Sequence, residues 1–175
     1  MALKRIMFIR HAEKPTAADD GVKKTGEQDA ESLIVRGWQR AGALVQFFAS
    51  EPTRKPNVIF ASGIGPHSKS QRPKQTVTPL ADWLQNLKII DDHLKDDVDG
   101  LMKSVLKQGG TVLVCWEHQL IPSLVGRLPN APKVPQIWPD DRFDIVWVLD
   151  PDNGSWKFSQ IPQLLLAGDS DQPIT

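Results

Sequence analysis

Histidine and arginine side chains follow directly after apolar segments of this chain. The stretch MFIRHAEKP ends an apolar run in Arg10 and His11, and VLVCWEH ends another in His118. A neutral imidazole can take a phosphoryl group onto one nitrogen while an acceptor holds its other N–H. A guanidinium group pairs with phosphate oxygens through two parallel hydrogen bonds. These residue types therefore indicate phosphoryl-transfer chemistry.

A third segment adds positive charge. Residues 52–75 contain no acid and five basic side chains, Arg54, Lys55, Lys69, Arg72 and Lys74. Residues 91–99 contain five Asp and one Lys. Most charge runs are solvated loops. The alternative is that the basic segment, with Arg72 at the end of the loop GIGPHSKSQRPK, forms one positive wall of an anion site and has acids nearby.

The elements that would position these side chains begin with strands. Short apolar segments that do not alternate with polar residues are typical of strands covered on both faces. Such segments occupy residues 6–9, 58–61, 87–90, 111–115 and 145–149. A sixth strand over 155–159 is expected after Asp-Asn-Gly, a hairpin turn sequence.

Apolar residues at helical spacing lie between the strands. They predict helices over 34–48, 77–87, 98–106 and 121–128. Alternating strands and helices predict an α/β domain with helices on both faces of the sheet. Ligands in such sheets bind beyond the carboxyl ends of the strands. That rule brings Arg10, His11, the segment after residue 61, the acids after residue 90, and His118 to one edge.

Length and composition indicate one ordinary globular domain over residues 1–175. The chain has 21 basic and 21 acidic residues, so its formal net charge is zero. A nucleic-acid or anionic-membrane binder would carry excess positive charge. The single cysteine, Cys115, lies in a predicted strand and indicates a packed thiol in a reducing compartment. No apolar stretch approaches a membrane span or a signal sequence, so we expect a cytoplasmic protein.

Four elements, taken in order, resemble those of the histidine phosphatase superfamily, in its phosphoglycerate-mutase-like branch. IRHAEK is similar to the Arg-His-Gly motif, with Ala12 in the Gly position. LIVRGWQRA, residues 33–41, is similar to the helix Leu-Thr-x-x-Gly-x-x-Gln-Ala. RPKQT, residues 72–76, resembles Arg-Ala-x-Gln-Thr, and VLVCWEH resembles the strand that ends in the second histidine.

The resemblance implies a three-layer sandwich, with a central, mostly parallel sheet and helices on both faces. It also implies that His11 accepts the phosphoryl group and that Arg10, Arg72 and His118 bind it. No metal or cofactor would be required. The partner would be a small phosphorylated substrate or a phosphoprotein, with no nucleic acid and no membrane.

The proton donor is the part of the site with several candidates. In the family the acid follows the third strand as Leu-x-Glu, and LKD places Asp96 there. Another branch has the acid after the second histidine, where this chain has Gln119. Glu117 would face away if its strand continued, and we expect Glu13 to pair with a Lys or Arg. The donor is therefore Asp96, Glu117, Glu13 or none of these.

The leading function is a metal-independent phosphomonoesterase that works through phospho-His11. The alternatives are a weak or inactive phosphate-binding member of the same fold, a phosphomutase, and, ranked last, a metallohydrolase that uses both histidines. The substrate is left open between a sugar phosphate, a nucleotide and a phosphohistidine on a protein. His67 and His93 are expected in exposed loops, and Trp116 and Trp138 in the core.

Overall fold

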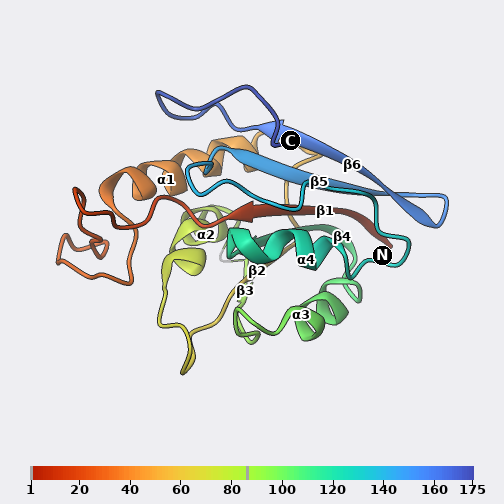
Figure 1. The fold of residues 1–175 in the computed structure, drawn as a ribbon, viewed down its shortest axis with the longest axis horizontal. Coiled ribbons are helices and arrows are strands. Elements are labelled where there is room, and N and C mark those ends of the chain that lie inside the picture. Colours follow the sequence, from red (N-terminus) through yellow and green to blue (C-terminus); the bar gives the residue numbers. More distant parts are fainter. Residues whose placement is uncertain (1, 86) are drawn as a thin grey trace.

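The computed structural model describes residues 2–85 and 87–175, and the strands within them form one six-stranded sheet (Figure 1). All six predicted strands are confirmed. They are β1 Leu3–Arg10, β2 Val58–Ala61, β3 Ile89–Ile90, β4 Gly110–Trp116, β5 Ile145–Asp152 and β6 Ser155–Pro162. β3 is shorter than predicted, because the Leu87 amide donates to the Ala81 carbonyl at the end of a helix instead of joining the sheet.

The strand order is β3-β2-β4-β1-β5-β6, and the directions change at β5. β1, β2, β3 and β4 run parallel, whereas β5 runs antiparallel to β1, and β6 antiparallel to β5. The predicted mostly parallel sheet therefore ends in an antiparallel pair. As a consequence, the start of β5 lies at the edge of the sheet where β1 and β4 end.

Helices cover both faces of the sheet. The helices are α1 Val35–Ala49, α2 Arg72–Trp83, α3 Val98–Val105 and α4 Ile121–Val125, with a 3-10 turn η1 over His118–Leu120. α1 and α2 contribute to one hydrophobic cluster with strand residues Met7 and Ile9. α3 and α4 contribute to the other, with Ile6 and Phe8. Both faces of β1 are thus buried, which explains its unbroken apolar sequence.

Two helices differ in extent from the sequence prediction. α2 begins at Arg72, before the apolar stripe, because Pro73 suits the first helical turn. α4 ends at Val125, although Leu128 beyond it is still buried. The earlier start of α2 places Arg72, a predicted phosphate residue, at the first position of this helix.

The buried face of α1 is rotated relative to the apolar stripe in which helical spacing places Trp38 and Val45. Trp38 and Val45 are only half-buried, whereas Leu44 and Phe47 are buried. The same face carries Arg40, which is 2% exposed. A buried arginine requires polar partners, and the site described below provides them.

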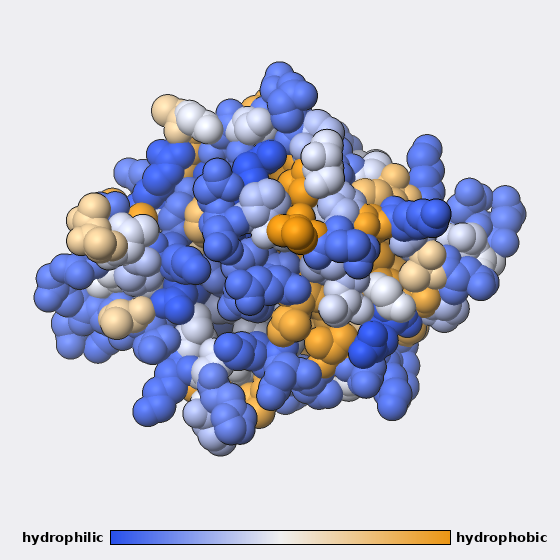
Figure 2. All heavy atoms as spheres, in the orientation of Figure 1, coloured by the Kyte–Doolittle hydropathy of each residue, from blue (hydrophilic) through white to orange (hydrophobic). Residues whose placement is uncertain are grey.

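The outer surface is predominantly hydrophilic in the view of Figure 2. No helix within residues 2–85 and 87–175 is long and apolar enough to cross a membrane. Trp116 and Trp138 are buried in the core, and His67 is exposed, as predicted. His93 is partly buried instead, because its two nitrogens contact the Asp97 carboxylate and the Ser104 hydroxyl, each at 2.8 Å.

Candidate active site

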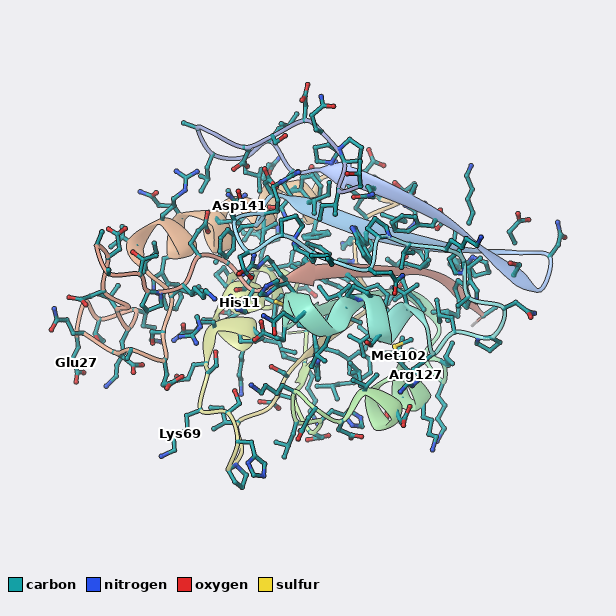
Figure 3. The ribbon with its side chains drawn as sticks, in the orientation of Figure 1. His11, Glu27, Lys69, Met102, Arg127 and Asp141 are labelled. Atoms are coloured by element: carbon teal, nitrogen blue, oxygen red, sulfur yellow. The ribbon has the colours of Figure 1, made fainter. Side chains whose placement is uncertain are left out.

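The predicted phosphate residues gather at one edge of the sheet. Arg10 is the last residue of β1 and pairs in register with Trp116, the last residue of β4. His11 and His118 follow these strands, and the His11 amide donates to the Trp116 carbonyl at 3.3 Å. Figure 3 places His11 at the end of β1. The convergence expected from parallel strands is therefore present.

The surroundings of His11 leave one ring nitrogen free for chemistry. Its Nδ1 lies 2.7 Å from the Ala12 carbonyl oxygen, which can only accept, so Nδ1 carries the hydrogen and donates. Nε2 then keeps its lone pair. The side chain is buried, and burial, together with the charges of Arg10 and Arg72, lowers the pKa of His11 from 6.5 to about 4. His11 is therefore neutral at physiological pH.

Arg10 is buried but only partly satisfied. Its Nη1 donates to the carbonyl oxygens of Pro139, Asp140 and Arg142, at 3.2, 2.8 and 3.1 Å. Its guanidinium carbon lies 3.8 Å from the centre of the Phe143 ring. Nε and Nη2 are buried and have no partner within the described part of the chain. Burial lowers the pKa of Arg10 to about 10, so the group stays charged and has two N–H groups available.

Arg72 is the first residue of α2, and its charge is one of those that lower the pKa of His11. Its Nη1 donates to the Ala30 carbonyl at 2.8 Å, and its Nη2 lies 3.9 Å from Glu31. Its Nε is buried and has no partner among the described residues. The Thr76 hydroxyl accepts from the Ala12 amide at 2.9 Å and donates to the Arg72 carbonyl at 2.7 Å. The RPKQT segment thus ties α2 to the loop after β1.

His118 lies between two carboxylates. Its Nε2 is 2.6 Å from Asp140 Oδ1, and its Nδ1 is 2.9 Å from Glu117 Oε1. The ring is buried, whereas the Asp140 side chain is 80% exposed. The Asp140 carboxylate can only accept, so Nε2 carries the hydrogen and donates, whereas Nδ1 is buried and has no hydrogen-bond partner among the described residues. His118 therefore presents Nε2 as its donor.

Glu117 faces the site, whereas the sequence expectation directed it away. Its contact with His118, whose Nδ1 lies 2.9 Å away, together with the positive charge of Arg10, lowers the pKa of Glu117 to about 2. The strand ends at Trp116, and the chain turns into η1, so the alternation of β4 does not extend to Glu117. An ionised Glu117 balances positive charge and does not supply a proton at neutral pH.

Asp96 is exposed and lies beside the 63–68 loop. Within residues 2–85 and 87–175, no hydrogen bond or ion pair joins its carboxylate to His11 or His118. Its role as proton donor stays a prediction. Glu13, in contrast, is held by Arg40, whose Nη2 lies 2.9 Å from Glu13 Oε1, as expected for an ion pair.

Arg40 links the loop after β1 to the C-terminal segment. Besides Glu13, it binds Asp169 with an Nη2–Oδ1 distance of 2.7 Å and the Gln163 side-chain oxygen at 3.0 Å. Arg40 and Asp169 side chains are each 3% exposed. Gly37 lets α1 approach this loop, because a Cβ there would lie 2.6 Å from the Glu13 carbonyl oxygen. The RGWQR segment is therefore a support for the loop that carries His11.

A hollow of about 450 Å³ opens next to these residues. Phe143 and Asp140 form its boundary with the site, since Phe143 covers Arg10 and its ring centroid lies 6.5 Å from that of His11. The remaining lining residues are Glu13, Lys14, Thr16, Ile34, Arg36, Arg40, Asp141, Asp144, Gly168 and Asp169. The hollow is large enough for the organic part of a small phosphate ester.

Sequence reasoning missed Asp140 and Phe143. Their segment precedes β5. If β5 ran parallel to β1, this segment would lie at the opposite edge of the sheet, away from His11. The hairpin sequence Asp-Asn-Gly predicts that β5 and β6 are antiparallel, as observed, but it does not predict the direction of β5 relative to β1. Within the described residues, no group of three or more His, Cys, Asp or Glu is arranged to hold a metal ion.

The comparison with solved structures finds similar proteins, whereas the comparisons of sequence do not. No protein-family model matches it, and no curated protein matches it significantly. The protein histidine phosphatase SixA, complexed with tungstate, aligns with a TM-score of 0.61 and 16% identity, over 91% of this chain and 97% of that one. A mycobacterial glucosyl-3-phosphoglycerate phosphatase complexed with VO3 aligns with a TM-score of 0.61 and 14% identity, over 89% and 97%.

A phosphoglycerate mutase from Plasmodium falciparum also aligns, with a TM-score of 0.57 and 15% identity, over 99% of this chain and 100% of that one. The three alignments cover nearly the full length of both partners. At these identities they show a shared fold. They confirm the predicted α/β fold class.

Proposed function

We propose that this chain, which has the fold of the histidine phosphatase superfamily, hydrolyses phosphomonoesters through a phosphohistidine on His11 and without a metal ion. One observation carries the proposal. A neutral His11 with a free Nε2 lies beside the buried Arg10 guanidinium, which has two unused N–H groups. Unpaired buried donors are costly unless an anion completes them.

The chemistry follows from these groups. The Nε2 lone pair of His11 forms a bond to phosphorus while the bond from phosphorus to the leaving oxygen breaks. Arg10, Arg72 and His118 donate hydrogen bonds to the phosphoryl oxygens and offset their charge. Water then attacks phosphorus while the bond from phosphorus to His11 Nε2 breaks, the water loses a proton to solvent, neutral His11 is regenerated and inorganic phosphate is released. The leaving oxygen takes its proton from Asp96, the donor that the sequence predicts, or from solvent.

The acids available as proton donors determine which leaving groups the site favours. The contacts with His118 lower the pKa of both Glu117 and Asp140, so these two neighbours of His118 are ionised. Asp96 has no contact with either histidine among the described residues. This arrangement favours leaving groups that need little protonation, such as an aryl oxide or the imidazole of a phosphohistidine. A phosphohistidine on a protein is therefore the second candidate substrate, consistent with the likeness to SixA.

Hydrolysis of an aryl phosphate in excess chelator tests the proposal. We expect wild type to turn over and His11→Ala to lose turnover by at least about a thousandfold. His67→Ala, a change at an exposed histidine, is the matched control and should retain activity. Rapid quench should trap an acid-labile, base-stable phosphoenzyme in wild type and in His67→Ala, but not in His11→Ala. Near wild-type turnover by His11→Ala would rule out nucleophilic catalysis by this residue.

Vanadate inhibition tests the contribution of Arg72. Arg72→Ala should weaken inhibition by about ten- to a hundredfold, since a charge-assisted pair is lost. Arg72→Lys should restore it only in part, because an ammonium group lacks the guanidinium fork. Lys69→Ala is the control, because Lys69 lies on the loop away from His11 (Figure 3). Equal inhibition of all four proteins would place Arg72 outside the phosphate site.

A further inference from the structure

Residue 140 contacts two of the groups that are proposed to bind phosphate. Its carbonyl oxygen accepts from Arg10 Nη1 at 2.8 Å, and its carboxylate Oδ1 lies 2.6 Å from His118 Nε2. Oxygen atoms of Asp140 thus accept hydrogen bonds from both Arg10 and His118. The two contacts differ in kind, because one uses the fixed backbone and the other uses a side chain that is 80% exposed.

Nε2 is the donor of His118 that a ligand could use. The other nitrogen, Nδ1, is buried against Glu117, whose Oε1 lies 2.9 Å away without a hydrogen bond between them, so Nδ1 is closed to an incoming oxygen. A phosphoryl oxygen that binds His118 must therefore replace the Asp140 carboxylate at Nε2. The carboxylate has an open path, since most of its surface is exposed to solvent.

Arg10 does not need to give up its existing contacts. Its Nη1 holds the carbonyl oxygens of residues 139, 140 and 142, while Nε and Nη2 are unused. The loop can therefore stay in place when an anion binds to Nε and Nη2. Only the side chain of Asp140 has to turn away.

We propose that Asp140 is a displaceable carboxylate, which holds His118 in position in the empty site and yields Nε2 to an oxygen of the incoming phosphoryl group. This inference rests on the proposed function, since it takes the same pocket as the phosphate site. Asp140 is then a positioning residue that competes with the ligand. Removing its carboxylate releases the donor and increases the fraction of protein that is ready to bind.

Tungstate, a phosphate mimic, provides a direct measurement by calorimetry without turnover. Asp140→Ala should bind tungstate about tenfold more tightly than wild type, which corresponds to about 1.4 kcal/mol. Asp141→Ala is the matched control. Asp141 is an exposed carboxylate beside Asp140 that lines the same hollow, and its side chain makes no hydrogen bond or ion pair within the described part of the chain.

The control separates a specific contact from a general effect of charge. Both variants remove one negative charge, from neighbouring residues that line the same hollow. We expect Asp141→Ala to change the tungstate affinity by less than about twofold, as for a screened surface charge. Equal tightening in both variants, or weaker binding by Asp140→Ala, would overturn the proposal.

A spectroscopic signature tests the contact itself. The Nε2–H proton of His118 should give a strongly deshielded resonance in the empty wild type and in Asp141→Ala, and lose it in Asp140→Ala. An unchanged resonance in Asp140→Ala would overturn the proposal. A third readout distinguishes acid catalysis. If Asp140→Ala lowers turnover of an alkyl phosphate alone and leaves tungstate affinity unchanged, Asp140 is a proton donor and the proposal fails.

The failure of this inference and of the proposed function are distinguishable. Wild type that binds tungstate but shows no turnover contradicts the phosphatase and leaves the comparison of Asp140→Ala with Asp141→Ala valid. Wild type that turns over, with no difference between these two variants, contradicts only the role of Asp140.

Discussion

Replacing His11 should change how the stability of this protein depends on pH. His11→Asn is the most informative substitution, because the Asn amide nitrogen can still donate to the Ala12 carbonyl but does not titrate. In wild type the pKa of His11 is lowered by burial, from 6.5 to about 4. As the pH falls between these values, the unfolded chain binds a proton that the folded chain does not. Folding stability is therefore lost in this window.

The size of the effect follows from the two pKa values. At about pH 7 the protonation of His11 contributes almost nothing to the difference between folded and unfolded chains. At about pH 4.5 proton binding by the unfolded chain lowers the free energy of unfolding by about 2.5 kcal/mol. This value follows from the extent of proton binding at pKa 6.5 in the unfolded chain and at about 4 in the folded chain. Glu117 titrates in a lower window, since its pKa falls from 4.5 to about 2. The two groups therefore act at separable pH values.

Urea unfolding of wild type and His11→Asn at several pH values between about 7 and 4.5 measures the effect. The free energy of unfolding should fall by about 2.5 kcal/mol more in wild type than in the variant over this pH range. The acid limb of wild-type activity should likewise lie near the lowered pKa of His11 instead of near 6.5. Parallel pH profiles for the two proteins would show that His11 titrates normally, and would refute the buried, neutral nucleophile.

Three further results are expected from other parts of the structure. Arg40→Met removes the buried partner that Glu13 and Asp169 share, which leaves Glu13 only the half-exposed Arg36, and should cost about 3–5 kcal/mol in urea unfolding, whereas Arg36→Met should cost about 1 kcal/mol or less. Gly37→Ala should cost about 1–3 kcal/mol and lower turnover, because the added Cβ meets the Glu13 carbonyl; an unchanged urea midpoint would contradict this close approach. Burial raises the pKa of the Cys115 thiol, so a thiol reagent should modify it only in urea; rapid modification of the native protein would contradict its place in the core.

The sequence predicted those parts of the site that depend on local order along the chain. Arg10, His11 and His118 follow strands, and parallel strands bring their carboxyl ends together whatever the loops do. The four family-like elements also predicted the fold, because each is one strand or helix with a recognisable end. Glu13 pairs with arginine as expected, since a buried acid next to β1 needs a positive partner.

Features that depend on strand direction or on distant contacts were not predictable in this way. The direction of β5 relative to β1 decides whether Asp140 and Phe143 reach His11, and no local pattern encodes it. The partner of Arg40 in the C-terminal segment is Asp169, which lies in a stretch without periodicity. The orientation of Glu117 depends on β4 ending at Trp116 and on the chain turning into η1 directly after it.

The antiparallel direction of β5 also has a consequence for how the protein is made. The histidines and the phosphate arginines are all synthesised within residues 10–118, yet the carbonyl groups that hold Arg10 come from residues 139–142. The Glu13 loop is completed later still, through Asp169. Pairing between such distant segments is slow to form, because a long chain must close first. On the ribosome, a nascent chain would therefore carry every residue of the proposed chemistry long before it could assemble the site.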